Sequence, residues 1–78
     1  MEIRFSVDDN YMKDLQGKVN GTKATLIASD ALALFNWAVG EIMNGRKVVS
    51  LDEEKDTYKE ITTPVLQKVK EVPETVGT

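Results

Sequence analysis

The residue types that could carry chemistry in this 78-residue chain are few, because the sequence contains neither histidine nor cysteine. General acid–base catalysis would then fall to carboxylates, and no carboxylate pair stands in a recognisably apolar setting. Neither a glycine-rich phosphate loop nor a nucleophile elbow occurs. The usual zinc ligands are missing, and the acidic run at residues 52–56 (DEEKD) lacks the glycine of a calcium loop. We therefore expect no enzyme, no metal site and no cofactor.

Polar and apolar side chains alternate strictly over residues 2–7 (EIRFSV). The polar set is Glu2, Arg4 and Ser6, and the apolar set is Ile3, Phe5 and Val7. A period of two predicts a half-buried β-strand. A strand this short needs a partner, and we favour the same segment of a second copy. The alternative is pairing with a later hairpin at residues 47–62 of the same chain, which would block pairing between copies.

A long helix is predicted for residues 22–44. Thr22 is a suitable N-cap residue, Gly45 suits the left-handed position after the helix, and Arg46 and Lys47 suit its negative end. Apolar residues recur at helical spacing: Ile27, Ala31, Leu34, Phe35, Ala38 and Ile42. Leu26, Leu32, Val39 and Met43 widen this stripe. At ~1.5 Å per residue the helix would be roughly 33 Å long. Because a chain this small cannot cover such a helix, we predict a homodimer.

The remaining segments are predicted from local signals. Asp8 is a suitable N-cap for a short helix at residues 9–19, which ends at the turn residues Asn20 and Gly21. Strands are predicted at residues 47–51 and 57–62 around the polar run, which gives a β-hairpin. Val65, Leu66 and Val69 indicate a final helical turn. We therefore divide the chain into a core at residues 1–46, an acidic extension at 47–71 and a flexible tail at 72–78.

The net charge of −3 argues, taken alone, against nucleic-acid binding. The charge is unevenly distributed: residues 1–47 hold six basic and six acidic side chains, whereas residues 48–78 hold four and seven. The first part is thus free to carry a local basic surface. We find no signal peptide and no segment approaching the ~20 apolar residues of a membrane span, so we expect a soluble cytoplasmic protein with no membrane partner.

The order of strand, short helix, tight turn and long helix within residues 2–44 resembles the ribbon-helix-helix family, which includes the Arc and methionine repressors. The residues that carry the resemblance are the EIRFSV segment, the Asp8 cap, the turn GTKAT at residues 21–25 and the second helix rich in leucine and alanine. The resemblance implies a mainly α fold of order β-α-α, in which two chains intertwine. Their opening strands then form one antiparallel ribbon that lies in the DNA major groove.

In that family the outward side chains of the ribbon read the bases, which here implies Glu2, Arg4 and Ser6. The Arg4 fork matches guanine O6 and N7 and would contribute ~1–3 kcal/mol of discrimination. The resemblance also implies that the amides at the start of the second helix hold a DNA phosphate, which here are those of Thr22, Lys23, Ala24 and Thr25. The implied intertwined core comprises Ile3, Phe5, Val7, Leu15, Leu26, Ile27, Leu34 and Phe35.

We accordingly predict a small transcriptional repressor that binds a double-stranded DNA operator as a homodimer. Within this hypothesis, residues 47–71 would be the arm through which an antitoxin captures its toxin. The alternative, favoured by the acidic charge and by Glu2, is a dimeric protein–protein interaction module that does not bind DNA.

Overall fold

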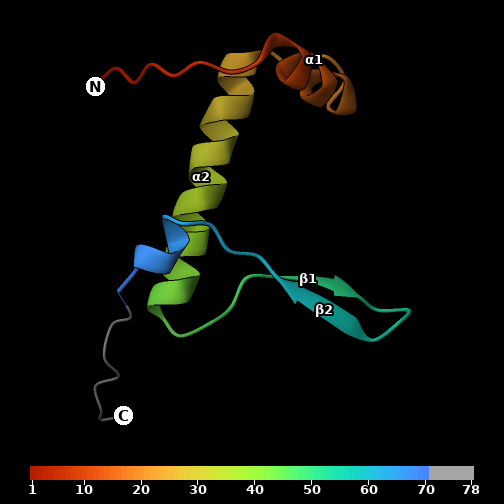
Figure 1. Cartoon of the computed structure of the whole chain (residues 1–78), viewed down its shortest axis with the longest axis vertical. Coiled ribbons are helices and arrows are strands. Elements are labelled where there is room, and N and C mark those ends of the chain that lie inside the picture. Colours follow the sequence, from red (N-terminus) through yellow and green to blue (C-terminus); the bar gives the residue numbers. More distant parts are fainter. Residues whose placement is uncertain (71–78) are drawn as a thin grey trace. The chain divides into compact units, whose positions relative to one another are not determined.

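The structure, a computed structural model, describes residues 1–70 and is mainly α-helical (Figure 1). Its elements, in chain order, are α1 (Asp9–Lys18), α2 (Ala24–Met43), β1 (Val49–Asp52), β2 (Thr57–Glu60) and the 3-10 turn η1 (Leu66–Lys68). The chain forms two compact units, Met1–Leu32 and the part from Ala33 onward, and the boundary lies within α2. The predicted flexible tail at residues 72–78 lies outside the described residues.

The order of elements is α-α-β-β, so the predicted β-α-α opening is wrong for a single chain. Residues 2–7 form no strand. Within the described residues the sheet contains only β1 and β2, so the alternative pairing of residues 2–7 with the hairpin is absent as well. The physical reason is that a β-ladder exists only where a second strand supplies the backbone partners.

Helix α1 begins as predicted and ends one residue earlier than expected. The Asp8 carboxylate accepts a hydrogen bond from the backbone N–H of Tyr11 at 2.9 Å, which confirms the N-cap. After the helix, Asn20 and Gly21 take positive φ values of 58° and 73°. The N–H of Gly21 donates to the carbonyl oxygen of Gln16 at 2.7 Å. These left-handed residues stop the helix and reverse the chain.

Thr22 does not have the predicted role of N-cap for the long helix. Its hydroxyl donates to the carbonyl oxygen of Val19 at 2.6 Å, so it closes the end of α1 instead. The tight turn before Thr22 brings its side chain beside the open carbonyl groups of the preceding helix. The first carbonyl group bonded within the long helix is that of Lys23, which accepts from the N–H groups of Leu26 and Ile27 at 3.0 and 3.1 Å.

The end of α2 confirms the predicted glycine signal. Gly45 has φ +80°, and its N–H donates to the carbonyl oxygen of Ile42 at 3.0 Å. The N–H of Arg46 donates to the carbonyl oxygen of Glu41 at 2.9 Å, which completes a Schellman motif. The Arg46 guanidinium also holds the Glu41 carboxylate through two hydrogen bonds of 3.0 Å. Main chain and side chain together fix the direction in which the extension leaves the helix.

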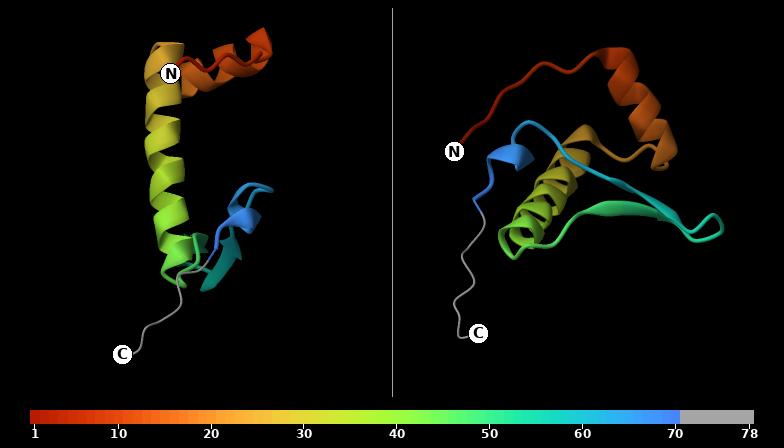
Figure 2. Two further views of the ribbon diagram at one scale, coloured as in Figure 1. Left: turned by 90° about the vertical axis from the view of Figure 1, so that its left-hand side faces the viewer. Right: turned by 60° about the horizontal axis from the view of Figure 1, so that its bottom comes forward.

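The predicted hairpin is confirmed with slightly different bounds. β1 and β2 pair antiparallel, with Val49 opposite Glu60, Ser50 opposite Lys59 and Leu51 opposite Tyr58. In the turn, the N–H of Lys55 donates to the Asp52 carboxylate at 3.3 Å, and Asp56 takes φ 53°. η1 confirms the predicted final helical turn. The hairpin extends away from the last turns of α2 (Figures 1 and 2).

The described chain has almost no core of its own. Among residues 1–70 only Ala38 and Leu66 are buried apolar residues, and both belong to the second unit. Helix α2 also has the length and hydropathy of a membrane span, contrary to our expectation. Its most apolar stretch of 18 residues has a mean hydropathy of 1.3, and 6% of that stretch is buried. The core helix of a soluble protein passes the same test, and α2 carries the charged residues Asp30 and Glu41. The apolar surface of α2 therefore lacks a cover among residues 1–70 of a single copy.

Candidate nucleic-acid interface

The apolar side chains of residues 2–7 share one side of the segment, although the segment is not a strand. Ile3, Phe5 and Val7 line one shallow hollow in the first unit. The rest of its lining comes from the two helices and the residue that opens α1: Asp9, Met12, Ala24, Thr25 and Ala28. The predicted alternation therefore holds for the placement of the apolar side chains.

The polar set of the same segment is exposed. Glu2, Arg4 and Ser6 are not among the residues that line the hollow, and their side chains make no hydrogen bond or ion pair with another residue of the described chain. The Arg4 guanidinium therefore has its full set of donors available for a planar acceptor such as a phosphate or a guanine edge. Free donors on Arg4 are what the predicted base contact would need, and that contact stays a prediction.

The start of α2 offers fewer amides than the four predicted. The N–H of Thr22 already donates to the carbonyl oxygen of Val19 at 3.3 Å. The N–H groups of Lys23, Ala24 and Thr25 have no acceptor among the described residues, as expected for the first turn of a helix. The exposed Lys23 ammonium belongs to the same turn and makes no ion pair with a described residue. Three amides and one cation thus suit an anion at this end.

None of the residues predicted for the dimer core is buried in the single chain. Phe5 keeps 70% of its surface exposed, and Leu34 keeps 65%. Ile3 and Leu26 are also exposed, and the half-buried members are Val7, Leu15, Ile27 and Phe35. The predicted core is therefore an apolar surface without a cover in one copy.

Charge in the first unit is balanced rather than basic. Residues 1–32 carry four basic and five acidic side chains. One acidic group is neutralised locally, because the Asp14 carboxylate lies 3.1 Å from the Lys18 ammonium, and Asp8 is bound to the first turn of α1. Attraction to phosphate would thus depend on where Arg4 and Lys23 lie and not on net charge.

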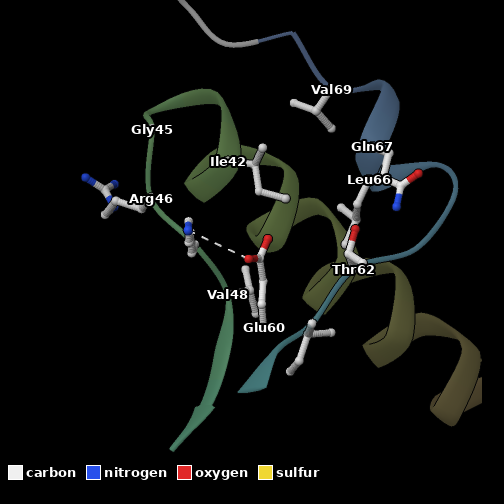
Figure 3. Close-up of a pocket in the computed structure, with 11 residues that line it drawn as sticks. Ile42, Gly45, Arg46, Val48, Glu60, Thr62, Leu66, Gln67 and Val69 are labelled. Carbon is white, nitrogen blue, oxygen red and sulfur yellow. Dashed lines mark ion pairs between the residues drawn. The ribbon is translucent and has the colours of Figure 1, made fainter. Parts of the chain in front are cut away.

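A second hollow, of about 260 Å³, lies in the second unit between the end of α2, the base of the hairpin and η1 (Figure 3). Its charged groups already have partners: the Lys47 ammonium lies 3.8 Å from the Glu60 carboxylate, and Arg46 points out of the hollow. Hydrogen bonding to Arg46 lowers the pKa of Glu41. The described residues contain no group of three or more potential metal ligands.

Comparison of the chain with models of known families, with curated proteins and with solved structures gave no match. Residues 2–7 and the start of α2, to which the family resemblance assigns the DNA contacts, belong to the same compact unit, and the contacts themselves stay predictions. Sequence reasoning overlooked the exposed pair Leu51 and Tyr58 on the hairpin, which the alternation of Val49, Ser50 and Leu51 would have indicated.

Proposed function

We propose that this chain forms a homodimer of the ribbon-helix-helix type and binds double-stranded DNA as a small transcriptional repressor in the cytoplasm. The observation that carries the proposal is residues 2–7. The apolar side chains of Ile3, Phe5 and Val7 line one hollow, and the polar side chains between them make no hydrogen bond or ion pair with a described residue. The segment also has no strand partner within the described chain. A second copy of the same segment satisfies all three conditions at once.

The gain from covering the apolar surface is large enough to drive dimerisation. Full burial of a leucine, isoleucine or phenylalanine side chain contributes roughly 1.5–3 kcal/mol. Phe5, Leu34 and Leu26 are each more than half exposed in the single chain, and two-fold symmetry doubles every contribution. Association itself costs about 4–15 kcal/mol, so a few such residues from each copy suffice.

Pairing of the two segments creates the DNA-reading surface. In an antiparallel ribbon the side chains of Ile3, Phe5 and Val7 face the helices, and those of Arg4 and Ser6 face outward twice by symmetry. A two-stranded ribbon fits the major groove, where an arginine fork recognises a guanine. The exposed start of α2 supports a backbone phosphate contact through Lys23, which would fix the ribbon in register.

The test of this proposal is an Arg4→Ala variant. A duplex selected from a random library by the parent protein serves as the probe. We expect the variant to bind this duplex roughly 5- to 150-fold more weakly, which corresponds to ~1–3 kcal/mol. The thermal melt should be unchanged, because Arg4 is exposed and makes no ion pair with a described residue. Equal affinity of variant and parent in a gel-shift titration would contradict base reading by Arg4.

Lys55→Ala is the matched control, since it removes another exposed cation, in the hairpin turn. We expect it to leave DNA affinity unchanged. Lys23→Ala should instead weaken binding to all duplexes about equally. It should also reduce the slope of log affinity against log salt concentration by about one, because one phosphate contact is lost. The three variants thus separate base reading from phosphate positioning and from the general effect of net charge.

The second candidate function is a dimeric protein–protein interaction module that does not bind DNA. The net charge of −3 and the acidic Glu2 beside Arg4 favour it. Retention on heparin or on random duplex DNA at low salt distinguishes the two, because the interaction module should not be retained. Both functions require a dimer, so a sedimentation mass of one chain would contradict both.

A further inference from the structure

The hairpin has one apolar face that its own unit leaves open. The register places Leu51 directly opposite Tyr58, and Val49 lies on the same face two residues before Leu51. Leu51 is 62% exposed and Tyr58 is 64% exposed. The opposite face is polar and carries Ser50 and Lys59 as a cross-strand pair. An exposed aromatic–aliphatic pair on one face of an otherwise polar hairpin is typical of a contact surface.

The backbone of the hairpin is equally open. Within the described residues the sheet has two strands, so β1 and β2 each have one edge without a partner strand. The hairpin extends away from the end of α2 (Figures 1 and 2), and the two buried apolar residues of the described chain, Ala38 and Leu66, lie outside the hairpin. A two-stranded hairpin is marginally stable without further packing. The hairpin therefore has both the edges and the face that an added extended segment uses.

The charge of the hairpin indicates what kind of extended segment it would bind. Residues 49–60 carry five carboxylates and two ammonium groups, and four of the carboxylates lie in the stretch from Asp52 to Asp56. Another hairpin would repel this charge, and so would α2, whose two charged residues, Asp30 and Glu41, are both acidic. Nucleic acid is disfavoured for the same reason. The occupant whose charge complements the acidic hairpin is a basic segment of a protein.

We propose that the face formed by Val49, Leu51 and Tyr58 docks a basic, extended segment of a different protein. Apolar side chains of that segment would pack on Leu51 and Tyr58, and its lysine or arginine side chains would lie near the acidic turn of the hairpin. This docking surface is separate from residues 2–7 and does not depend on DNA binding.

The experiment uses the full chain and two synthetic peptides of equal length, one alternating lysine with valine and the other alternating glutamate with valine. Calorimetric titration should show binding of the lysine peptide and none of the glutamate peptide. The double variant Leu51→Thr, Tyr58→Thr should bind the lysine peptide at least roughly tenfold more weakly, because it loses the apolar face. Threonine favours strands, so the hairpin is retained.

The matched control, Ser50→Thr with Thr57→Ser, changes the polar face and should bind like the parent. Amide contacts between Ser50 and Lys59 in the parent, and between the same positions in each variant, report whether the hairpin is intact. If the hairpin is lost in the double variant, the single variant Tyr58→Thr replaces it and should also bind the lysine peptide more weakly than the parent, whereas Tyr58→Phe, which keeps the apolar ring, should bind like the parent. DNA titrations of all variants, expected to be unchanged, separate this proposal from the function proposed above.

Three results would overturn the proposal. Unchanged binding of the lysine peptide by the threonine variant would mean that charge alone attracts the peptide. Assembly of the parent beyond a dimer that disappears in the threonine variant would identify a second copy as the occupant. If neither peptide binds, the face does not take an extended basic segment.

Discussion

Two segments of this chain have the same alternation of apolar and polar residues, and only one of them is a strand. Residues 2–7 have no regular secondary structure and no partner strand among the described residues, whereas Val49–Asp52 pairs with Thr57–Glu60 across a short turn. The two segments differ in the element that comes next along the chain. Helix α1 comes directly after the first segment, whereas a turn closed by Asp52 and a second strand come after the other.

The comparison shows what each segment still lacks. The hairpin has its backbone partners and lacks only a cover for Leu51 and Tyr58. Residues 2–7 lack both, since Phe5 is exposed and no strand lies beside the segment in the described chain. A partner of residues 2–7 must therefore supply backbone hydrogen bonds together with apolar contacts, which an identical segment does by symmetry.

The largest expected effect comes from Phe5→Ala. If Phe5 is buried between two copies, its truncation should cost about 3–5 kcal/mol for each copy and raise the dimer dissociation constant by at least about two orders of magnitude. Sedimentation equilibrium over a range of concentrations measures this change. Leu51→Ala is the matched variant, because it truncates an apolar side chain of the hairpin that is 62% exposed, against 70% for Phe5. It should leave the dimer intact; equal effects of both variants would contradict the difference between the two segments.

Local signals in the sequence were sufficient where a few neighbouring residues decide the structure. The Asp8 cap, the glycine end of α2 at Gly45 and the hairpin turn were all predicted and are all present. Each depends on residues within a few positions of one another. Thr22 was misassigned because its hydroxyl had two possible partners, and the left-handed residues before it place it beside Val19.

The candidate site was predictable only in part. Alternation predicted Arg4 and Ser6 as outward residues, and both are exposed, but Ile3 and Phe5 are exposed as well, so the assignment stays a prediction. Alternation did not show whether residues 2–7 are a strand, because strand formation depends on a partner that lies elsewhere. The burial of Phe5 and Leu34 is likewise a property of an assembly, and neither the sequence nor one copy of the chain contains it.

A smaller effect is expected in the hairpin turn. Asp56 has φ 53°, a conformation that aspartate tolerates and that β-branched residues avoid. Asp56→Val should destabilise the turn by roughly 1–2 kcal/mol and remove the amide contacts between Ser50 and Lys59. Asp56→Gly is the control and should keep them. The dimer mass should be unchanged in both variants, so a loss of dimer would link the hairpin to the pairing of residues 2–7.

A substitution in the connection between α2 and the hairpin should have a smaller effect on stability. Gly45 has φ +80°, and a Cβ atom added there would meet nothing within 4 Å, so Gly45→Ala introduces backbone strain without a clash. We expect a loss of about 1 kcal/mol in the free energy of unfolding. Denaturation followed through the fluorescence of the single tryptophan, Trp37, measures it. Gly40→Ala, at a position inside α2 with equally open space, should instead stabilise the protein slightly.

The smallest expected effect is on pH dependence. Hydrogen bonding to Arg46 lowers the pKa of Glu41 in the folded chain. The pair therefore stabilises the fold above the ordinary pKa of a glutamate, and this contribution is lost as the pH falls through the lowered value. Glu41→Gln should flatten the dependence of stability on pH over that acidic range. DNA binding at neutral pH should be unchanged. A parent profile that gains stability on acidification in this range would contradict the assigned sign.

The most direct test of the proposed dimer is an isotope-filtered NMR experiment on a mixture of labelled and unlabelled copies. Pairing of residues 2–7 between copies predicts contacts across the label boundary centred near Phe5, with backbone amide protection on alternate residues of the segment. Absence of such contacts at concentrations where the protein sediments as a dimer would contradict the account, as would contacts of this segment with the hairpin of its own copy.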